Sequence, residues 1–513
     1  MRIEARLRDS VRRFAAKTAL VVGDHHLTYA ELDAFSDRLA HSLISQGVQH
    51  GDRVLMLLEN STEAVVSFFG IWKAGAVACP LHPSTKADKL ATIIDSTGAR
   101  VLITQARHRN TAGAAVEKAI SKPLLVVAQG EDSGVQCFED MITGAPDATL
   151  PLLPDCDDLA LLIHTSGSTG LPKGVMLSHA NIDAACTAIA SYLKNSGDDV
   201  VLSVLPLSHG YGITQMVTMA AVGGRLVLEK SFAFPRKTME RLAEVKATGF
   251  PLVPAMAAMI NGMTDLPPGS FPHLRYVTSA AAAMPPAFIQ RLQQLLPQTD
   301  LFIMYGQTEC LRATYLPPDE LERRPLSVGK AIPGTRAFVV DEDGLPLPPG
   351  VVGELVIEGP HVMRGYWGDG LATMRALQPT AQGLRLRTGD LFSMDEDGFL
   401  YFISRSDDII KTRGEKVSPQ EVERALYELP GIKEAAVGGI DDPIFGQTIR
   451  AYVVLGEGAA LSERDIIRHC AGVLEDFMVP KSVEFRDALP RTPTGKIRLS
   501  ADETRSTEQG NVA

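Results

Sequence analysis

Compact runs of apolar residues alternate with segments of helical spacing in the first part of the chain. Residues 33–43 place apolar side chains three and four positions apart, which predicts a helix, and residues 52–59 contain an apolar run that predicts a buried strand. Residues 65–72 return to helical spacing, and residues 76–80 form another apolar run. This alternation is typical of parallel sheets covered by helices.

The strand pattern recurs further along the chain, bounded each time by glycine, proline or polar residues. The further predicted strands lie at residues 124–128, 159–163, 200–205, 225–229 and 301–304. Beyond about residue 327 the apolar runs become shorter and turn residues separate them, as at 336–341 and 353–358. We therefore predict a long α/β region followed by a β-rich subdomain over about residues 327–404.

A polar segment at residues 404–408 interrupts this pattern, and a compact α+β unit follows it. Its predicted helices lie at residues 419–429 and 462–474, and its predicted strands at 434–440 and 451–455. We expect a domain boundary at the polar segment, which gives an N-terminal domain over residues 1–404 and a C-terminal domain over residues 405–513. At 513 residues the chain is long enough for two such cores.

Composition and charge exclude several classes of protein. The chain is 45% hydrophobic and 22% charged, as in ordinary globular proteins, and its net charge of −11 disfavours nonspecific binding to nucleic acid or anionic membranes. The six cysteines form no C-x-x-C pair, and the first ten residues mix both charge signs without an apolar run. We therefore expect a cytoplasmic protein without a membrane span.

Residues 161–179 read LLIHTSGSTGLPKGVMLSH, in which an apolar strand runs into a loop rich in hydroxyl groups and glycine. The glycines allow close backbone approach, the hydroxyl groups donate hydrogen bonds, and Lys173 adds one positive charge, so the loop suits phosphate oxygens. Lys173 does not follow the G-x-x-x-x-G-K-[ST] spacing of the common P-loop. The alternative is a flexible surface turn, but the preceding strand and the lysine favour phosphate binding.

This loop resembles the signature of the adenylate-forming superfamily, which includes acyl-CoA synthetases, nonribosomal-peptide adenylation domains and firefly luciferase. Residues 305–309, YGQTE, are similar to a second motif of that family. There the resemblance implies that Tyr305 stacks on adenine, Thr308 contacts phosphate and Glu309 holds Mg²⁺. A carboxylate is a suitable hard ligand for Mg²⁺ beside a triphosphate.

Two later segments extend the resemblance across the polar break. Residues 386–391, LRTGDL, contain Asp390, which the resemblance implies accepts both ribose hydroxyls. Residues 402–423 resemble the hinge and thioester-forming loop, with Arg405 at the ribose or phosphate, and Asp407 as the hinge. The family usually has glycine before this arginine, whereas this chain has serine.

The last two matching segments carry the residues nearest the reacting atoms. Residues 490–497, PRTPTGKI, resemble the C-terminal motif whose lysine, here Lys496, bridges the substrate carboxylate and the α-phosphate. Residues 205–212, LPLSHGYG, resemble the segment whose histidine, here His209, lies against the acyl carboxylate. A solvated lysine and a structural histidine are the ordinary alternatives, and the surrounding motifs favour the functional roles.

The resemblance implies a fold and a set of site residues. The fold is a large N-terminal domain of stacked mixed sheets with helices and a β-rich subdomain, followed by a small mobile C-terminal domain. The implied catalytic residues are Lys496, His209, Thr165, Lys173 and Glu309. The implied ATP- and AMP-binding residues are Thr165, Ser166, Gly167, Ser168, Thr169, Gly170, Lys173, Ala280, Ala281, Ala282, Met304, Tyr305, Gly306, Gln307, Thr308, Asp390, Phe402, Arg405 and Lys496. The implied acyl pocket comprises His209, Gly210, Tyr211, Gly212, Ser279, Ala280, Gly306 and Gln307, and the implied CoA site comprises Gly414, Glu415 and Lys416.

The activity implied is that of an AMP-forming acyl-CoA synthetase, with ATP, Mg²⁺ and coenzyme A, acting as a monomer or homodimer. Adenylation domains for amino acids usually have an aspartate near residues 207–210, and none stands there, which favours an acid without an α-amino group. Because Gln307 and Arg312 are polar, an acyl group that carries an oxygen substituent or a second carboxylate stays an alternative. The alternatives are an enzyme that loads a carrier-protein phosphopantetheine, a luciferase-like oxygenase, and a nucleotide-binding regulatory protein. Retention of both Lys173 and Lys496 argues against the last of these.

Overall fold

The computed structural model describes residues 1–130, 135–166, 172–263, 265–381, 383–405, 408–412, 415–442, 446–491, 497 and 499. Its helices are α1 (Ile3–Phe14), α2 (Tyr29–Ser45), α3 (Thr62–Lys73), α4 (Ala87–Thr97), α5 (Arg109–Lys118), α6 (Phe138–Thr143), α7 (His179–Tyr192), α8 (Gly210–Val222), α9 (Pro235–Glu244), α10 (Pro254–Asn261), α11 (Pro286–Leu295), α12 (Gly370–Ala376), α13 (Pro419–Tyr427) and α14 (Glu463–Val473). Short 3₁₀ turns are formed by Ala106–His108 and Pro318–Glu320. Within this described part, no helix combines the length and apolar character needed to cross a bilayer.

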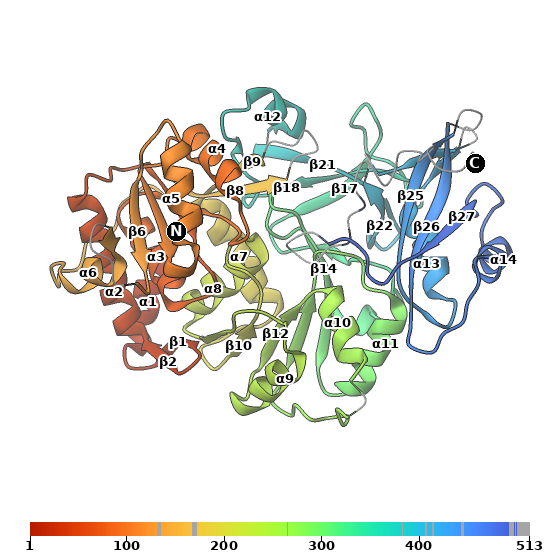
Figure 1. Cartoon of the computed structure of the whole chain (residues 1–513), viewed down its shortest axis with the longest axis horizontal. Coiled ribbons are helices and arrows are strands. Elements are labelled where there is room, and N and C mark those ends of the chain that lie inside the picture. Colours follow the sequence, from red (N-terminus) through yellow and green to blue (C-terminus); the bar gives the residue numbers. More distant parts are fainter. Residues whose placement is uncertain are drawn as a thin grey trace, which may run out of the picture.

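Two large sheets form the N-terminal part of the molecule (Figure 1). The first has the order β16 (Lys330–Ala331), β15 (Thr314–Leu316), β14 (Asp300–Tyr305), β13 (Tyr276–Ser279), β12 (Gly249–Leu252), β10 (Val200–Ser203), β11 (Arg225–Leu228), β1 (Thr18–Val22) and β2 (His25–Thr28). The second has the order β19 (Gly365–Tyr366), β9 (Pro172–Ser178), β8 (Leu159–Ser166), β4 (Val77–Pro80), β3 (Arg53–Leu57), β5 (Val101–Gln105), β6 (Leu124–Ala128) and β7 (Gln136–Cys137). The middle strands are parallel, as the alternation predicts, whereas pairs such as β1/β2, β8/β9 and β14/β15 are antiparallel.

Three groups of helices pack against these sheets. Alternate side chains on a buried strand face opposite sides of its sheet and so contact different groups of helices. On β3, Val54 and Met56 enter the central core with α2, α3, α7 and α8, while Leu55 and Leu57 face a second core with α4 and α5. On β14, Phe302 enters the central core and the neighbouring odd-numbered residues face a third core with α9, α10 and α11. The sheets therefore enclose the central helices, and each is covered on its outer face.

Local sequence signals begin several of these helices. Thr28 and Glu31 form a capping box at the start of α2, in which each side chain bonds the other residue's backbone N–H. Ser178 and Asn181 form the same arrangement at α7. Gly223 ends α8 in the left-handed conformation, with a φ of 80°.

A smaller sheet and the C-terminal unit follow. The smaller sheet has the order β17 (Arg336–Val340), β18 (Gly353–Glu358), β21 (Gly383–Met394) and β20 (Leu377–Thr380), and β22 (Leu400–Arg405) also pairs with β21. The C-terminal sheet has the order β24 (Glu415–Val417), β23 (Ile410–Thr412), β26 (Gly446–Leu455) and β25 (Ile432–Asp442), and β27 (Ser482–Phe485) also pairs with β26. This sheet lies with α13 and α14 at one end of the molecule (Figure 1) and has its own apolar core.

Candidate active site

The ends of three strands bring together a tyrosine, an aspartate and an arginine. The Tyr305 hydroxyl at the end of β14 donates to Asp390 Oδ2 on β21 over 2.5 Å, and Arg405 Nε on β22 donates to Asp390 Oδ1 over 3.1 Å. Gln307 Nε2 donates to the Tyr305 hydroxyl over 3.1 Å and to Thr388 O over 3.2 Å. Four residues predicted for the nucleotide site therefore lie in direct contact, although they are up to 100 positions apart in sequence.

Aromatic rings surround this cluster. The Tyr305 ring contacts the Phe392 ring edge-on at 4.9 Å between centroids, and Phe402 lies 5.3 Å from Phe392. Burial, reinforced by the charge of Asp390, raises the pKa of Tyr305 well above its ordinary value. Tyr305 therefore stays protonated at neutral pH and keeps donating to Asp390. The partly exposed Tyr305 and Phe402 rings offer an apolar surface to a purine, Phe392 is buried beside them, and the carboxylate offers an acceptor to ribose.

The strand pair β8/β9 carries two of the predicted phosphate-binding residues. Thr165 lies opposite Lys173 in the register of the two strands, and Thr165 Oγ1 donates to Lys173 O over 3.4 Å. Ser166 is the last residue of β8. Gly167, Ser168, Thr169 and Gly170 lie outside the described residues. The two strands therefore bring both ends of the predicted loop to one edge of the second sheet.

Tyr366, on the neighbouring strand β19, connects this strand pair to the YGQTE motif. The Tyr366 hydroxyl donates to Glu309 Oε1 over 2.9 Å, and Lys173 Nζ lies 5.4 Å from the centre of the Tyr366 ring. Met363 N also donates to Glu309 O over 2.8 Å. Burial and the nearby Glu309 charge raise the pKa of Tyr366, so the phenol remains a donor. Tyr366 thus contacts both Lys173 and Glu309, which are 136 positions apart in sequence.

Sequence reasoning missed Tyr366. Tyr366 belongs to no periodic apolar pattern, and its role arises only because β19 pairs with β9. The sequence Gly365-Tyr366-Trp367 contains a glycine followed by two aromatic residues, which is the one local signal available. Gly365 has a φ of 135°, a conformation that favours glycine.

Glu309 could hold a magnesium ion. The described residues contain no cluster of three or more metal-ligating side chains. Mg²⁺ beside a nucleotide usually takes one or two protein carboxylates and completes its coordination with phosphate oxygens and water. Glu309 fits that donor set, because its carboxylate is held by Tyr366 and lies near Lys173 of the predicted phosphate-binding loop.

The segment that carries His209 forms the start of α8, and buried contacts fix its backbone. Asn60 Nδ2 donates to Leu205 O over 3.0 Å, and Asn60 Oδ1 accepts from Leu207 N over 3.0 Å. The His209 ring lies 5.8 Å from the ring of His82, whose pKa is lowered by burial. A Cβ at Gly212 would come within 2.3 Å of Pro206 O, so only glycine fits there.

The other predicted acyl-pocket residues lie around this helix start. The Tyr211 hydroxyl is hydrogen-bonded to Thr278 Oγ1 at 2.8 Å, next to the fully buried Ser279. A Cβ at Gly306 would come within 2.8 Å of Leu311 O, so the YGQTE motif packs closely against the turn that follows it. Gln307, predicted to line the acyl pocket as well, directs its amide to the Asp390 cluster.

Among the remaining predicted residues, several are placed and others are not. Ala280 is buried at the end of β13, Ala281 has a φ of 82°, and Ala282 is exposed. Met304 is buried, and its sulfur accepts from the Tyr192 hydroxyl. Glu415 and Lys416 lie on β24, where they pair with β23. Lys496, Asp407 and Gly414 lie outside the described residues.

An open depression of about 690 Å³ lies elsewhere, between α1 and the turn after α7. Its lining includes Arg6, Arg12, Phe14 and Asn195, and none of the motif residues. Because it is a surface hollow without a predicted catalytic group, we do not place the substrates there.

Comparison with known proteins identifies the family of the chain. A family profile described as AMP-binding enzyme matches residues 7–367, and one described as AMP-binding enzyme C-terminal domain matches residues 421–496. A probable CoA ligase of Humulus lupulus is 31% identical over 499 residues, covering 96% of this chain and 94% of the relative. A feruloyl-CoA synthase of an Amycolatopsis species is 32% identical over 488 residues, covering 94% of each chain.

Solved structures show the same architecture. The chain is similar to ATP-bound MatB from Rhodopseudomonas palustris, with a TM-score of 0.88, 30% identity and 97% coverage of each chain. It is also similar to a benzoate CoA ligase from Burkholderia xenovorans LB400, with a TM-score of 0.87, 28% identity and coverage of 97% and 99%. These likenesses confirm the predicted mixed-sheet fold and the predicted enzyme class. The chain therefore belongs to the AMP-binding enzyme family and is an ATP-dependent acid–thiol ligase.

Proposed function

We propose that the chain joins a carboxylic acid to coenzyme A in two steps at the site around Asp390 and Glu309. In the first step a carboxylate oxygen bonds to the α-phosphorus of ATP while the bond to pyrophosphate breaks, which yields acyl-AMP. In the second step the CoA thiolate, after loss of its proton, bonds to the acyl carbonyl carbon and AMP leaves. The convergence of Tyr305, Asp390 and Arg405 is the observation that carries this proposal.

The contacts support one role for each end of the nucleotide. Asp390 has two oxygens with several lone pairs, so it can accept from ribose hydroxyls while Tyr305 and Arg405 remain nearby. Glu309 would hold Mg²⁺, which when bound supplies positive charge beside the phosphates. Lys173 and Thr165, on the paired strands, would bind phosphate oxygens and offset the charge that develops on them.

We assign the carboxylate end of the reaction to His209 and Lys496. His209 lies at the N-terminus of α8, where backbone N–H groups also favour an anion. Lys496 would approach from the C-terminal domain and reduce the repulsion between the carboxylate and the α-phosphate. This assignment for Lys496 rests on the PRTPTGK motif.

We further propose that residues 1–404 and 405–513 are the two domains and that the second turns about Asp407 between the steps. The turn would withdraw Lys496 and bring Gly414, Glu415 and Lys416 to the thiol. Among the described residues, the contacts that join the C-terminal unit to the rest include a hydrogen bond from Ser418 Oγ to Ile403 O over 2.6 Å and the Phe288 and Tyr427 rings, whose centroids lie 6.4 Å apart. Single contacts of this kind can be exchanged when a domain changes orientation.

The acid is proposed to lack an α-amino group, because residues 207–210 provide no aspartate for an ammonium ion. Coenzyme A is the proposed thiol acceptor, in line with the names of the relatives, and a carrier-protein phosphopantetheine is the alternative. All six cysteines are free thiols, which supports a cytoplasmic location.

Pyrophosphate release over a panel of carboxylic acids, with and without CoA, tests this function. We expect release that depends on the acid, and acyl-CoA and AMP as products when CoA is present. Release with amino acids alone would favour loading of a carrier protein. No release with any acid would overturn the proposed function.

A further inference from the structure

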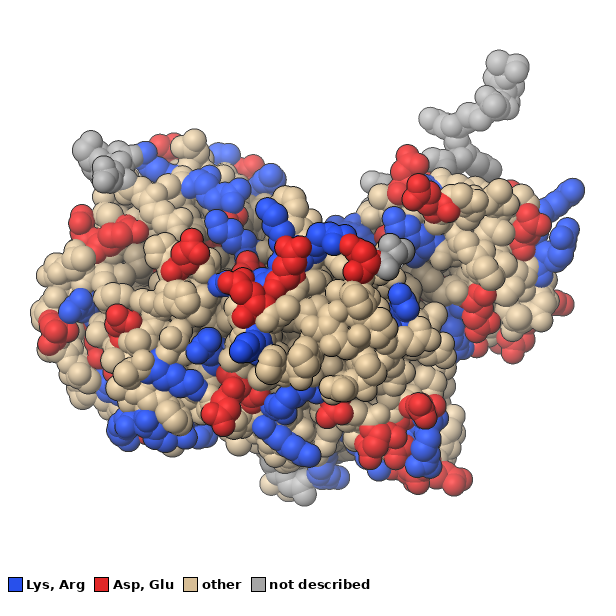
Figure 2. All heavy atoms as spheres, turned by 90° about the horizontal axis from the view of Figure 1, so that it is seen from below, with Lys and Arg blue, Asp and Glu red and all other residues tan. Residues whose placement is uncertain are grey.

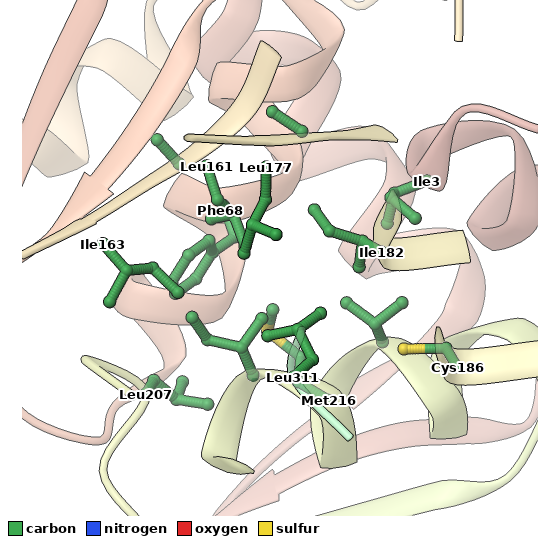
Figure 3. Packing of buried hydrophobic residues seen from close by; sticks show 14 of the residues in the cluster. Ile3, Phe68, Leu161, Ile163, Leu177, Ile182, Cys186, Leu207, Met216 and Leu311 are labelled. Atoms are coloured by element: carbon green, nitrogen blue, oxygen red, sulfur yellow. The ribbon is translucent and has the colours of Figure 1, made fainter. Parts of the chain in front are cut away.

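Arg312 lies in the turn that joins β14 to β15, three residues after Glu309. The preceding residue, Leu311, has a φ of 58°, and its side chain lies in the central core near Met216 (Figure 3). A Cβ at Gly306 would come within 2.9 Å of Arg312 Cα, so the turn packs directly against the YGQTE motif. The backbone of Arg312 is therefore held in one place beside the proposed acyl site.

The guanidinium of Arg312 is buried, and no carboxylate among the described residues lies within ion-pair distance of it. Arg312 is only 2% exposed, and its Nε has no hydrogen-bond partner in this part of the chain. The Tyr211 ring lies 4.9 Å from the guanidinium carbon, and the Tyr192 phenol, which donates to Met304 Sδ, is near enough to be affected by the guanidinium charge. Neither tyrosine supplies a negative charge.

Other buried basic side chains of the described structure do have carboxylate partners, in contrast to Arg312. Arg2 is 3% exposed and pairs with two carboxylates, and Lys73 is 5% exposed and also pairs with two. A buried cation is normally paired because the loss of its hydration must be offset. The missing partner of Arg312 therefore requires an explanation.

The acidic groups around Arg312 cannot provide that partner by losing a proton. Burial raises the pKa of Tyr211 to about 12 and the pKa of Cys310 to about 12, so both stay neutral at pH 7. The motif carboxylate of Glu309 accepts instead from Tyr366. The positive charge is thus left without an internal counterion in the described structure.

We propose that Arg312 binds a second carboxylate of the acyl substrate, so that the acid activated here is a dicarboxylic acid with a short spacer. This inference rests on the proposed function, because it places the reacting carboxylate at His209. His209 and Tyr211 both lie at the first turn of α8, and Arg312 packs on the Tyr211 ring, so the two carboxylates would be close together. A guanidinium can bind a carboxylate through two parallel hydrogen bonds from Nε and a terminal nitrogen, and Nε of Arg312 has no partner among the described residues.

Matched acids that differ only in the second carboxylate test this inference. Pyrophosphate release by the full chain is measured with succinate against butanoate and with glutarate against pentanoate. We expect kcat/KM to be at least about 100-fold higher for a dicarboxylate than for its partner, because the monocarboxylate leaves the guanidinium unpaired. In Arg312→Met this ratio should fall toward one.

Arg323→Met is the matched control, because Arg323 lies on the surface with 68% of its side chain exposed. It should keep the wild-type ratio. Equal losses for both acids in Arg312→Met would indicate a structural role in the tyrosine cluster and overturn the inference. A wild-type enzyme that prefers the monocarboxylates would also overturn the inference. This comparison needs no variant, so it holds even if Arg312→Met does not fold. It would leave the proposed function intact.

Discussion

At the residue scale, the site depends on Asp390 as a shared acceptor. Its two oxygens accept hydrogen bonds from the Tyr305 hydroxyl and from Arg405 Nε. Two residues earlier on the same strand, Thr388 Oγ1 donates to Leu355 O, which holds the strand in position. The side chain is only 7% exposed, so its charge acts in a poorly hydrated environment. Loss of this charge should therefore affect nucleotide binding strongly.

We predict that Asp390→Asn raises the KM for ATP by roughly 10- to 100-fold, because an amide has one acceptor oxygen and no charge to pair with Arg405. Steady-state pyrophosphate release measures this change. Asp395→Asn is the control, since Asp395 binds Arg324 and Tyr401 outside the site. A KM for ATP within twofold of wild type in Asp390→Asn would contradict the assignment.

Much of this residue-scale picture could be predicted from sequence, because Lys173, Tyr305, Glu309 and Asp390 each lie in a motif. The contacts between the motifs could not be predicted. Tyr366 meets Glu309 through tertiary pairing of β19, and the isolation of Arg312 is a property of its surroundings that a sequence does not display.

At the element scale, α13 is attached to its sheet through a carboxyl group. Glu423 Oε1 accepts from Val437 N on β25 over 2.9 Å. Burial raises the pKa of Glu423 from 4.5 to about 7. The folded state thus binds this proton more tightly than the unfolded state does.

We predict that the free energy of unfolding of the C-terminal unit falls by ~2 kcal/mol as pH rises from about 4.5 to about 7, because the Glu423 carboxyl ionises in the unfolded chain over this range while the folded chain still holds the proton. Glu423→Gln should remove this pH dependence, whereas the exposed Glu428→Gln should keep it. Hydrogen exchange of α13 and β25 in the full chain across this range measures the effect. Equal pH dependence in wild type and Glu423→Gln would contradict it.

Several elements predicted from sequence correspond to elements of the structure, and others were missed. The predicted helix at 419–429 corresponds to α13, and the predicted strand at 200–205 corresponds to β10. Strand β12 was not predicted, because its four residues, Gly249–Leu252, include Pro251, which ordinarily argues against a strand. Pairing with β13 on one side overrides that local preference.

At the scale of the whole molecule, the proposed site lies where the larger N-terminal body meets the C-terminal unit. Seen from below, the surface is hollowed between these two parts, and side chains of both charge signs surround the hollow (Figure 2). Asp390 and Arg405 pair on β21 and β22, directly before the C-terminal unit begins. Nucleotide binding and the position of this unit should therefore be coupled.

Exchange of labelled pyrophosphate into ATP tests the central claim, that an acyl-adenylate forms through Lys496, most directly. With a carboxylic acid and Mg²⁺ but no CoA, we predict exchange by the wild-type chain and its loss in Lys496→Ala. The same variant should still convert a supplied acyl-AMP and CoA to the thioester. Exchange that requires CoA, or equal loss of both half-reactions in Lys496→Ala, would contradict the account.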